Sequence, residues 1–394
     1  MKILLSAYSC APDEGSEPEA GLRVLAAAAS RHDVWLLFRA DQEDRLVPWL
    51  RVHGLSEQVR LVPVAVGNFQ DAFTHSKVRT FRHYWRWQRA IRPIAAALQA
   101  EIGFDVIHHA TYATFYTPVG IDALDVPMVW GPVGGANQAP LLLWWTMGWK
   151  GVARDLIRLA AQTLLRRVIR PQHNVRGRLE VLAQNVSTAK AIGGKNISIV
   201  PNGTSVNVED AFEDPPGARD KVVVSVSRLI SWKGTWLAIN AMRHVQVAQK
   251  LRIYSDGPDL ARLVGVVEKL GLEEKVEFAG LVPRAELLKI VRHSGVLLHP
   301  ALRDEAPLAV GEAMSLGAPV VLLTGSGAHE VAATWADGFR AVKPSWAQAT
   351  ARRLAVAIDQ SLDDAPPVLT SPRPSNLDFS KEILWAYQRA ADLP

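Results

Sequence analysis

Cysteine and long apolar runs are what this 394-residue sequence most plainly lacks. Because no stretch of about 18 uncharged apolar residues occurs, no membrane-spanning helix is expected. The opening residues, MKILLSAYSC, are apolar for too short a run before Pro12, which predicts a buried first strand and not a signal peptide. The single cysteine, Cys10, excludes an intramolecular disulfide and a cysteine-cluster metal site, and it agrees with a reducing, cytoplasmic setting.

The composition is that of a globular protein with ample core, since 48% of the residues are hydrophobic and 21% are charged. Its length favours two domains of roughly 200 residues each. The formal net charge of +5 indicates a polyanionic neighbour, which is nucleotide phosphate, anionic lipid or nucleic acid.

Short apolar runs alternate with helical patterns in both halves of the chain. Such runs are typical of strands buried on both faces of a parallel sheet. The predicted strands cover residues 2–8, 33–38, 59–64, 105–110 and 126–132, then 221–229, 251–257, 275–280, 295–300 and 319–325. Helices are expected at 235–245, 259–272 and 379–391. The repeated β-α-β-α order predicts an α/β protein with two doubly wound, Rossmann-like halves.

A Pro-, Gly- and acid-rich stretch at 205–220 marks the boundary between the halves. The predicted domains are therefore 1–205, completed by the C-terminal helix 377–394, and 206–376. No solenoid repeat is present.

The segment SRLISWKG (227–234) follows a predicted strand and leads into a helix. Because ligands of doubly wound sheets bind outside the carboxyl ends of strands, Arg228 and Lys233 are candidates for holding a diphosphate. A surface arginine and lysine near a strand end are also common without any such role.

Carboxylates are spaced along HPALRDEAPLAVGEAM (299–314). Asp304 and Glu305 fall in the loop that enters a helix, and Glu312 falls within that helix. Such groups accept hydrogen bonds from sugar and ribose hydroxyls. A helix cap and a solvated helix face are the plain alternative.

The order of these motifs resembles the retaining glycosyltransferases of family 4. They are SRLxxxKG at 227–234, DGP at 256–258, FxG at 278–280, and the D-x7-E-A-M segment that runs into PVV at 304–321. The first half is similar more loosely, through residues 6–21, 105–111, 130–137 and 201–206. The resemblance implies a GT-B fold and the transfer of a sugar from a GDP- or UDP-linked donor, with no other cofactor.

The resemblance also assigns roles to residues. It implies that Arg228 and Lys233 hold the donor diphosphate, and that Glu312 binds the ribose. Asp304 stands where the family usually has glutamate, near the donor sugar, and Glu305 partly fills that role. Backbone at five further positions is expected to approach the donor: Gly15, Ser16, Gly257, Ala306 and Leu308.

Two adjacent histidines, His108 and His109, end the predicted strand at 105–110. Strand alternation sends only one of them toward the crevice. The family has a histidine near the transferred sugar, which favours His109, while a structural role for both is the alternative.

In the family, the acceptor attacks on the face from which the nucleotide leaves, so no side-chain nucleophile is required. Arg228 and Lys233 then do what Mg²⁺ does in metal-dependent transferases. The absence of a paired Asp-x-Asp motif from the sequence agrees with a site that has no metal.

Two segments, 77–93 and 141–171, are basic and rich in tryptophan. This composition suits the headgroup layer of an anionic membrane, where a lipid-linked saccharide acceptor would be met. It predicts a protein held peripherally at the inner face of the plasma membrane. The alternative is a pair of helices that pack their aromatics inward. The predicted contacts are Arg82, Trp85, Arg86, Trp87, Trp144, Trp145, Trp149 and Lys150.

Two rival functions remain. A non-enzymatic nucleic-acid-binding protein would use the same basic segments, but no recognised nucleic-acid fold signature accompanies them. A GT-B phosphorylase or synthase acting on a soluble glycan is the other, although the chain is short for a phosphorylase.

Overall fold

The computed structural model describes residues 1–12, 16–67, 77–168, 178–204, 208–213, 215 and 217–393, with the backbone alone for 16, 77, 78 and 166–168. The chain divides into two compact units. Unit 1 comprises Met1–Ala136, Ala161–Val200 and Asp378–Pro394, and unit 2 comprises Asn137–Ala160 and Pro201–Leu377. Residues 137–160 therefore pack with the second unit, although the sequence analysis placed them in the first domain.

Unit 1 is built on a seven-stranded parallel sheet in the order β3-β2-β1-β4-β5-β6-β7. The strands are β1 Lys2–Ser6, β2 Asp33–Arg39, β3 Val59–Val64, β4 Val106–His109, β5 Met128–Val133, β6 Leu179–Ala183 and β7 Ile197–Ile199. The helices are α1 Ser16–Ala29, α2 Glu43–Val52, α4 Lys77–Ile102, α6 Val186–Ile192 and α13 Phe379–Ala391, with the 3₁₀ turn η1 Ala40–Gln42. The long helix α5 (Gly148–Val168) contains the unit boundary.

Unit 2 is built on a six-stranded parallel sheet in the order β10-β9-β8-β11-β12-β13. The strands are β8 Val222–Ser225, β9 Lys250–Ile253, β10 Val276–Phe278, β11 Val296–His299, β12 Val320–Leu323 and β13 Phe339–Val342. The helices are α7 Thr235–Ala241, α8 Leu260–Leu270, α9 Arg284–His293, α10 Leu308–Ser315, α11 Gly327–Ala332 and α12 Ala347–Asp363. Four 3₁₀ turns complete it: η2 Leu141–Met147, η4 Asn202–Thr204, η5 Glu209–Phe212 and η6 Ser231–Lys233.

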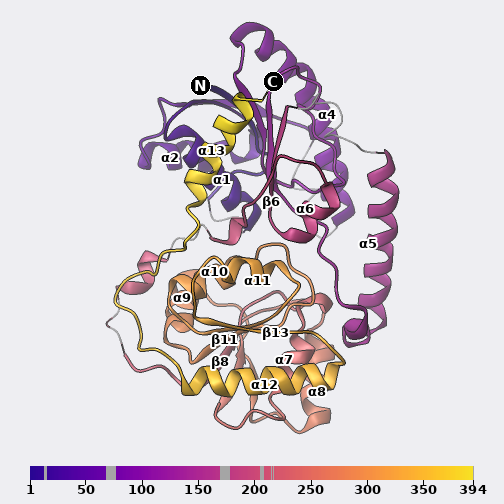
Figure 1. Ribbon diagram of the computed structural model, residues 1–394, viewed down its shortest axis with the longest axis vertical. Coiled ribbons are helices and arrows are strands. Elements are labelled where there is room, and N and C mark those ends of the chain that lie inside the picture. Colours follow the sequence, from indigo (N-terminus) through magenta and orange to yellow (C-terminus); the bar gives the residue numbers. More distant parts are fainter. Residues whose placement is uncertain are drawn as a thin grey trace. The chain divides into compact units, whose positions relative to one another are not determined.

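Burial on both faces explains why the strands of unit 2 read as continuous apolar runs. Val223 packs into the cluster beneath α7 and α12, while its neighbour Val224 packs into the cluster beneath α10 and α11. Figure 1 shows α10 and α11 over one face of this sheet and α12 over the other. Successive side chains of a strand point to opposite faces, so only an apolar run fills both layers.

The predicted α/β class with two Rossmann-like sheets is confirmed, and all ten predicted strands are present. The predicted C-terminal helix spans Phe379–Ala391 and belongs to unit 1 with the N-terminal sheet. Three strands were not predicted: β6, β7 and β13.

Candidate functional site

The loop after β8 carries Arg228 and Lys233 at the carboxyl end of the unit 2 sheet. Arg228 is exposed. Between them, buried Leu229 fixes the loop, because its N–H donates to the carbonyl of Asp256 at 2.9 Å. Lys233 closes η6 immediately before α7. The two cations therefore lie on a short, anchored loop at the edge where parallel sheets bind ligands.

Gly234 connects this loop to α7 in a conformation that only glycine adopts easily. Its φ is +73°, and a Cβ there would lie 1.9 Å from the carbonyl oxygen of Pro300. The glycine of the predicted SRLxxxKG motif thus lets the loops after β8 and β11 touch. Gly257 acts in the same way in the loop after β9, since its Cβ would lie 2.4 Å from the carbonyl oxygen of Leu229.

Asp304 is the centre of a buried charge cluster. Its Oδ2 accepts a hydrogen bond from the Lys233 ammonium and lies 3.0 Å from Nε2 of His299, the last residue of β11. Burial raises the pKa of Asp304, but Lys233 and His299 outweigh that effect and hold the pKa well below its ordinary value. Burial also lowers the pKa of His299, against the opposing influence of Asp304.

The backbone of the Asp304–Pro307 loop is held by close neighbours. The carbonyl of Asp304 accepts from the Gly327 N–H at 2.9 Å and from Asn137 Nδ2 at 2.8 Å. A Cβ on Gly327 would lie 1.6 Å from the carbonyl oxygen of Glu305, and one on Gly203 would lie 3.0 Å from those of Ala306 and Pro307. Gly203, Gly327 and Asn137 thus pack closely against the backbone of this loop.

The carboxylate of Glu305 turns toward the segment before η2, because its Oε1 accepts from the backbone N–H of Asn137 at 3.2 Å. Leu308 is the first residue of α10, and the N-cap residue Pro307 makes no side-chain capping hydrogen bond. The first backbone N–H groups of α10 have no partner within the helix, and they follow Asp304 closely in the sequence.

Glu312 lies on α10 and is mostly buried, with 13% of its side chain exposed. Its Oε1 accepts from Arg284 through Nη2 at 2.7 Å and Nε at 3.2 Å. Arg284, the first residue of α9, was not predicted as a site residue. Its only signal in the sequence is a position directly after Pro283, where a helix begins.

His299 and Asn137 also contact predicted site residues without having been predicted. His299 ends an apolar strand, and Asn137 ends the WGPVGGAN stretch about 170 positions before its partners. Sequence spacing carries no signal for such long-range contacts.

His108 and His109 point to opposite faces of the unit 1 sheet, as strand alternation predicts, yet both are fully buried. His108 contacts the Tyr387 hydroxyl at 2.8 Å and the Gly131 carbonyl at 2.7 Å. His109 lies 3.2 Å from the Ser6 hydroxyl and 3.1 Å from the Tyr84 hydroxyl. Both imidazoles contact residues of unit 1, and neither is exposed to solvent.

Burial lowers the pKa of His108 to about 4 and that of His109 to about 3. Both rings are therefore neutral at neutral pH, with each ring nitrogen in a hydrogen bond. Gly15 lies outside the described residues. Ser16 begins α1, but its side chain is also outside them.

The two basic, aromatic segments have opposite orientations. On α4, Trp87 and Tyr84 are buried and Trp85 is half-buried, while Arg82 and Arg86 are exposed. This is the inward-packing alternative, and Trp87 has no surface to offer a membrane.

In η2 and α5 several large apolar side chains are exposed, although Leu143 and Met147 are buried. Trp145 is 54% exposed, Trp149 is 77% exposed, and Lys150 is exposed beside them. Trp144 is half-buried and donates from Nε1 to the Ala139 carbonyl.

Within the described part of the chain, no helix has the length and hydropathy needed to cross a bilayer. In that same part, no group of three or more His, Cys, Asp or Glu side chains is arranged to hold a metal ion.

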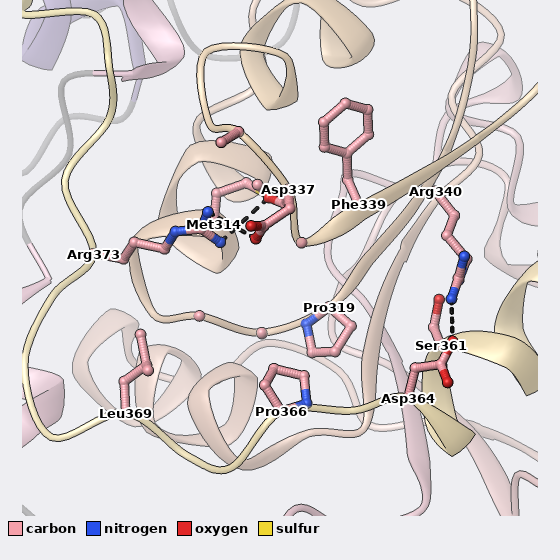
Figure 2. A pocket seen from close by; sticks show the side chains of 14 residues that line it. Met314, Pro319, Asp337, Phe339, Arg340, Ser361, Asp364, Pro366, Leu369 and Arg373 are labelled. Atoms are coloured by element: carbon pink, nitrogen blue, oxygen red, sulfur yellow. Dashed lines mark hydrogen bonds and ion pairs between the residues drawn. The ribbon is translucent and has the colours of Figure 1, made fainter.

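A hollow of about 830 Å³ in unit 2 lies where β12 and β13 begin (Figure 2). The ion pairs Arg373–Asp337 and Arg340–Asp364 border it. Its described lining contains none of the predicted site residues, which lie at the carboxyl ends of strands.

Residues 208–366 match the family described as Glycosyl transferases group 1. Among curated relatives, WcaL of Escherichia coli (strain K12), a glycosyltransferase assigned to colanic acid biosynthesis, is 32% identical over 172 residues, which are 41% of this chain and 42% of WcaL. The amylovoran biosynthesis glycosyltransferase AmsK of Erwinia amylovora is 27% identical over 52% of this chain and 51% of AmsK. The chain thus spans about half or less of the length of these relatives.

Two solved structures share the GT-B fold across the whole chain. The structure of Anabaena Alr3699/HepE in complex with UDP-glucose matches with a TM-score of 0.55 at 17% sequence identity, and the alignment covers 100% of this chain and 98% of the HepE chain. The structure of WaaG, a glycosyltransferase involved in lipopolysaccharide biosynthesis, matches with a TM-score of 0.55 at 15% sequence identity, and the alignment covers 99% of this chain and 94% of the WaaG chain.

Proposed function

We propose, on the premise that residues 208–366 are a group 1 glycosyl transferase domain, that the protein is a retaining glycosyltransferase. It moves a sugar from a UDP- or GDP-linked donor to a lipid-linked saccharide acceptor in exopolysaccharide or cell-surface glycan assembly. The observation that supports this best is the cluster of Arg228, Lys233, Asp304 and Glu312 on loops and a helix at one edge of the unit 2 sheet.

In this proposal the departing diphosphate is stabilised by cationic side chains and backbone N–H groups. Arg228 is exposed, and Lys233 keeps 18% of its side chain exposed, so both can reach a phosphate. The first turn of α10, which Pro307 does not cap, supplies N–H groups, among them that of Leu308. Preorganised positive charge of this kind lowers the barrier to nucleotide departure.

The carboxylates orient the sugars. Glu312, whose position Arg284 fixes through two hydrogen bonds, accepts hydrogen bonds from the ribose hydroxyls. Lys233 and His299 engage Oδ2 of Asp304, so Asp304 contacts the donor sugar through Oδ1, which also accepts from the Glu305 N–H at 3.2 Å. The acceptor hydroxyl attacks on the face that the nucleotide leaves, so the anomeric configuration is kept without a covalent intermediate.

The lipid-linked acceptor is proposed from the outward face of residues 141–157. Five of its large apolar side chains are more than half exposed: Leu141, Trp145, Trp149, Leu156 and Ile157. The exposed cations Lys150 and Arg154 lie beside them, and the only acid of residues 141–160, Asp155, is buried. Apolar side chains flanked by cations fit the headgroup layer of an anionic membrane.

A thermal-shift titration with UDP, GDP and ADP tests the donor site. One nucleotide at a hundredfold excess over its Kd should stabilise the protein by about 2.7 kcal/mol. Arg228→Ala should lose this response, whereas Arg243→Ala, at an exposed arginine beyond the far end of α7, should keep it. No response to any nucleotide would refute the proposal.

Two further measurements test the finer claims. Proton NMR of the sugar first released from the donor should show the anomer of the donor itself, and the opposite anomer would refute retention. Sedimentation with phosphatidylglycerol vesicles at low salt should carry the wild type down but not Trp149→Ser/Ile157→Ser. A wild-type protein that ignores these vesicles would refute the membrane surface.

A further inference from the structure

The first half of α5 has exposed apolar side chains and a buried acid. Trp149, Leu156 and Ile157 lie on its outward side, while Gly151 and Asp155, one turn apart, are buried within unit 2. A surface helix normally exposes its charged side chains instead. Besides Leu143 and Met147, which pack into the core of unit 2, the inward side of residues 137–158 makes three specific contacts, and each of them lies beside the candidate donor site.

The first contact is made by Gly151 against η6. A Cβ on Gly151 would lie 2.6 Å from Cβ of Ser231, so no larger side chain fits there. Ser231 opens the turn that Lys233 closes. The backbone of α5 thus packs directly on the turn that carries the cation.

The second contact is a buried ion pair. Asp155 is 1% exposed and accepts from Arg303 Nη2 at 2.9 Å and from Arg158 Nε at 3.0 Å. The guanidinium of Arg303 lies over the Trp232 ring, 4.3 Å from its centroid. Arg303 directly precedes Asp304, and Trp232 directly precedes Lys233. Asp155 therefore anchors the residues adjacent to both members of the Lys233–Asp304 pair.

The third contact is that of Asn137, which is 2% exposed. It donates from Nδ2 to the Asp304 carbonyl and from its backbone N–H to Glu305. Among the described residues no partner reaches its Oδ1. All three contacts connect one continuous segment to the two loops that hold the candidate diphosphate ligands.

We propose that docking of residues 141–157 on an anionic membrane raises the affinity of the donor site for nucleotide, and that Asp155 and Arg303 are the positioning residues that transmit this effect. The inference rests on the proposed function and specifies its regulation. A membrane that holds the outward face restricts the motion of Gly151 and Asp155, and through them the motion of the loops bearing Lys233 and Asp304. A nucleotide that binds loops already ordered loses less conformational entropy, which gives positive coupling.

Thermodynamic linkage makes the proposal measurable from both sides. If vesicles raise the affinity for UDP by some factor, UDP must raise the affinity for vesicles by the same factor. We expect about fivefold or more, the lower end of typical coupling between sites. UDP affinity is measured by calorimetry with and without vesicles of mixed phosphatidylglycerol and phosphatidylcholine, and vesicle affinity is measured by sedimentation with and without UDP.

Asp155→Asn and Arg303→Lys are the test variants. Each weakens the buried pair with little change of volume, and the second keeps the charge, so one folded variant is sufficient. Asp337→Asn is the matched control, because it breaks an ion pair with Arg373 in the same unit, beside the hollow away from the site.

The expected result is coupling in the wild type and in Asp337→Asn, and its loss in Asp155→Asn and Arg303→Lys, which still bind UDP and vesicles separately. Wild-type protein that binds both without mutual effect overturns this inference and leaves the proposed function standing. Coupling that persists in the test variants overturns the assigned route. Absence of vesicle binding, or of binding to both UDP and GDP, overturns the inference together with the proposal on which it rests. A protein that binds only GDP is tested with GDP in place of UDP.

Discussion

Lowering the pH should destabilise unit 1 through His108 and His109. Burial lowers their pKa values from 6.5 to about 4 and about 3. Below about pH 6.5 these histidines are protonated in the unfolded chain but stay neutral in the folded protein. The free energy of unfolding therefore decreases as the pH falls from about 6.5 to the pKa values of the folded state. At about pH 5 the solution is about 1.5 pH units below the ordinary histidine pKa, and each unit costs about 1.36 kcal/mol. The free energy of unfolding therefore falls by about 2 kcal/mol per histidine and by about 4 kcal/mol for both.

The assay is urea unfolding between about pH 8 and pH 5, comparing the wild type with His108→Gln/His109→Gln. Other histidines whose pKa values are lowered also contribute to the wild-type curve: His32, His83, His244, His299 and His329. The difference in pH slope between the two proteins isolates the pair. An equal slope in both would refute the reasoning, as would imidazole NMR shifts of the protonated form in folded protein at about pH 5.

Three further predictions concern packing. A double-mutant cycle of Lys233→Met and Asp304→Asn, measured by urea unfolding, should give a coupling of about 2 kcal/mol, since both side chains are more than four-fifths buried; a value near zero would contradict the ion pair. Gly234→Ala should cost about 3 kcal/mol or more, because the new Cβ meets the Pro300 carbonyl at a positive φ; an unchanged Tm would contradict this contact. Trp87→Ala should cost about 3–5 kcal/mol, whereas Trp149→Ala should change the free energy of unfolding by less than about 0.5 kcal/mol; equal losses would contradict the two orientations.

The clearest of the predicted strands, β8 and β12, are buried on both faces. Residues 222–225 and 320–323 carry apolar side chains at every or nearly every position, which is a strong local signal. The unpredicted strands are weaker signals: β7 has three residues, and β13 at the sheet edge is partly exposed. Such strands form because they pair with a neighbouring strand, and their own apolar pattern is too short or too mixed to predict them.

The composition of a helix also does not predict which of its side chains are buried. Helices α4 and α5 share arginines and tryptophans, yet Trp87 is buried and Trp149 is exposed. The difference arises from the partner surface, because α5 places Gly151 and Asp155 against unit 2. Motif order singled out Lys233 and Asp304 separately, but not their contact with each other. His299 and Asn137 reach Asp304, and Arg284 reaches Glu312, through contacts that no local spacing encodes.

The glycines around residues 300–307 have a consequence for engineering. Gly203, Gly234 and Gly327 each leave less room than a methyl group needs beside the carbonyls of that loop. For the proposed donor site, a library aimed at a new donor sugar should therefore leave Gly234 and Gly327 unchanged, because any side chain there meets a backbone carbonyl. Diversity belongs at the side chains of Asp304 and Glu305, whose replacement does not disturb the contacts of those glycines.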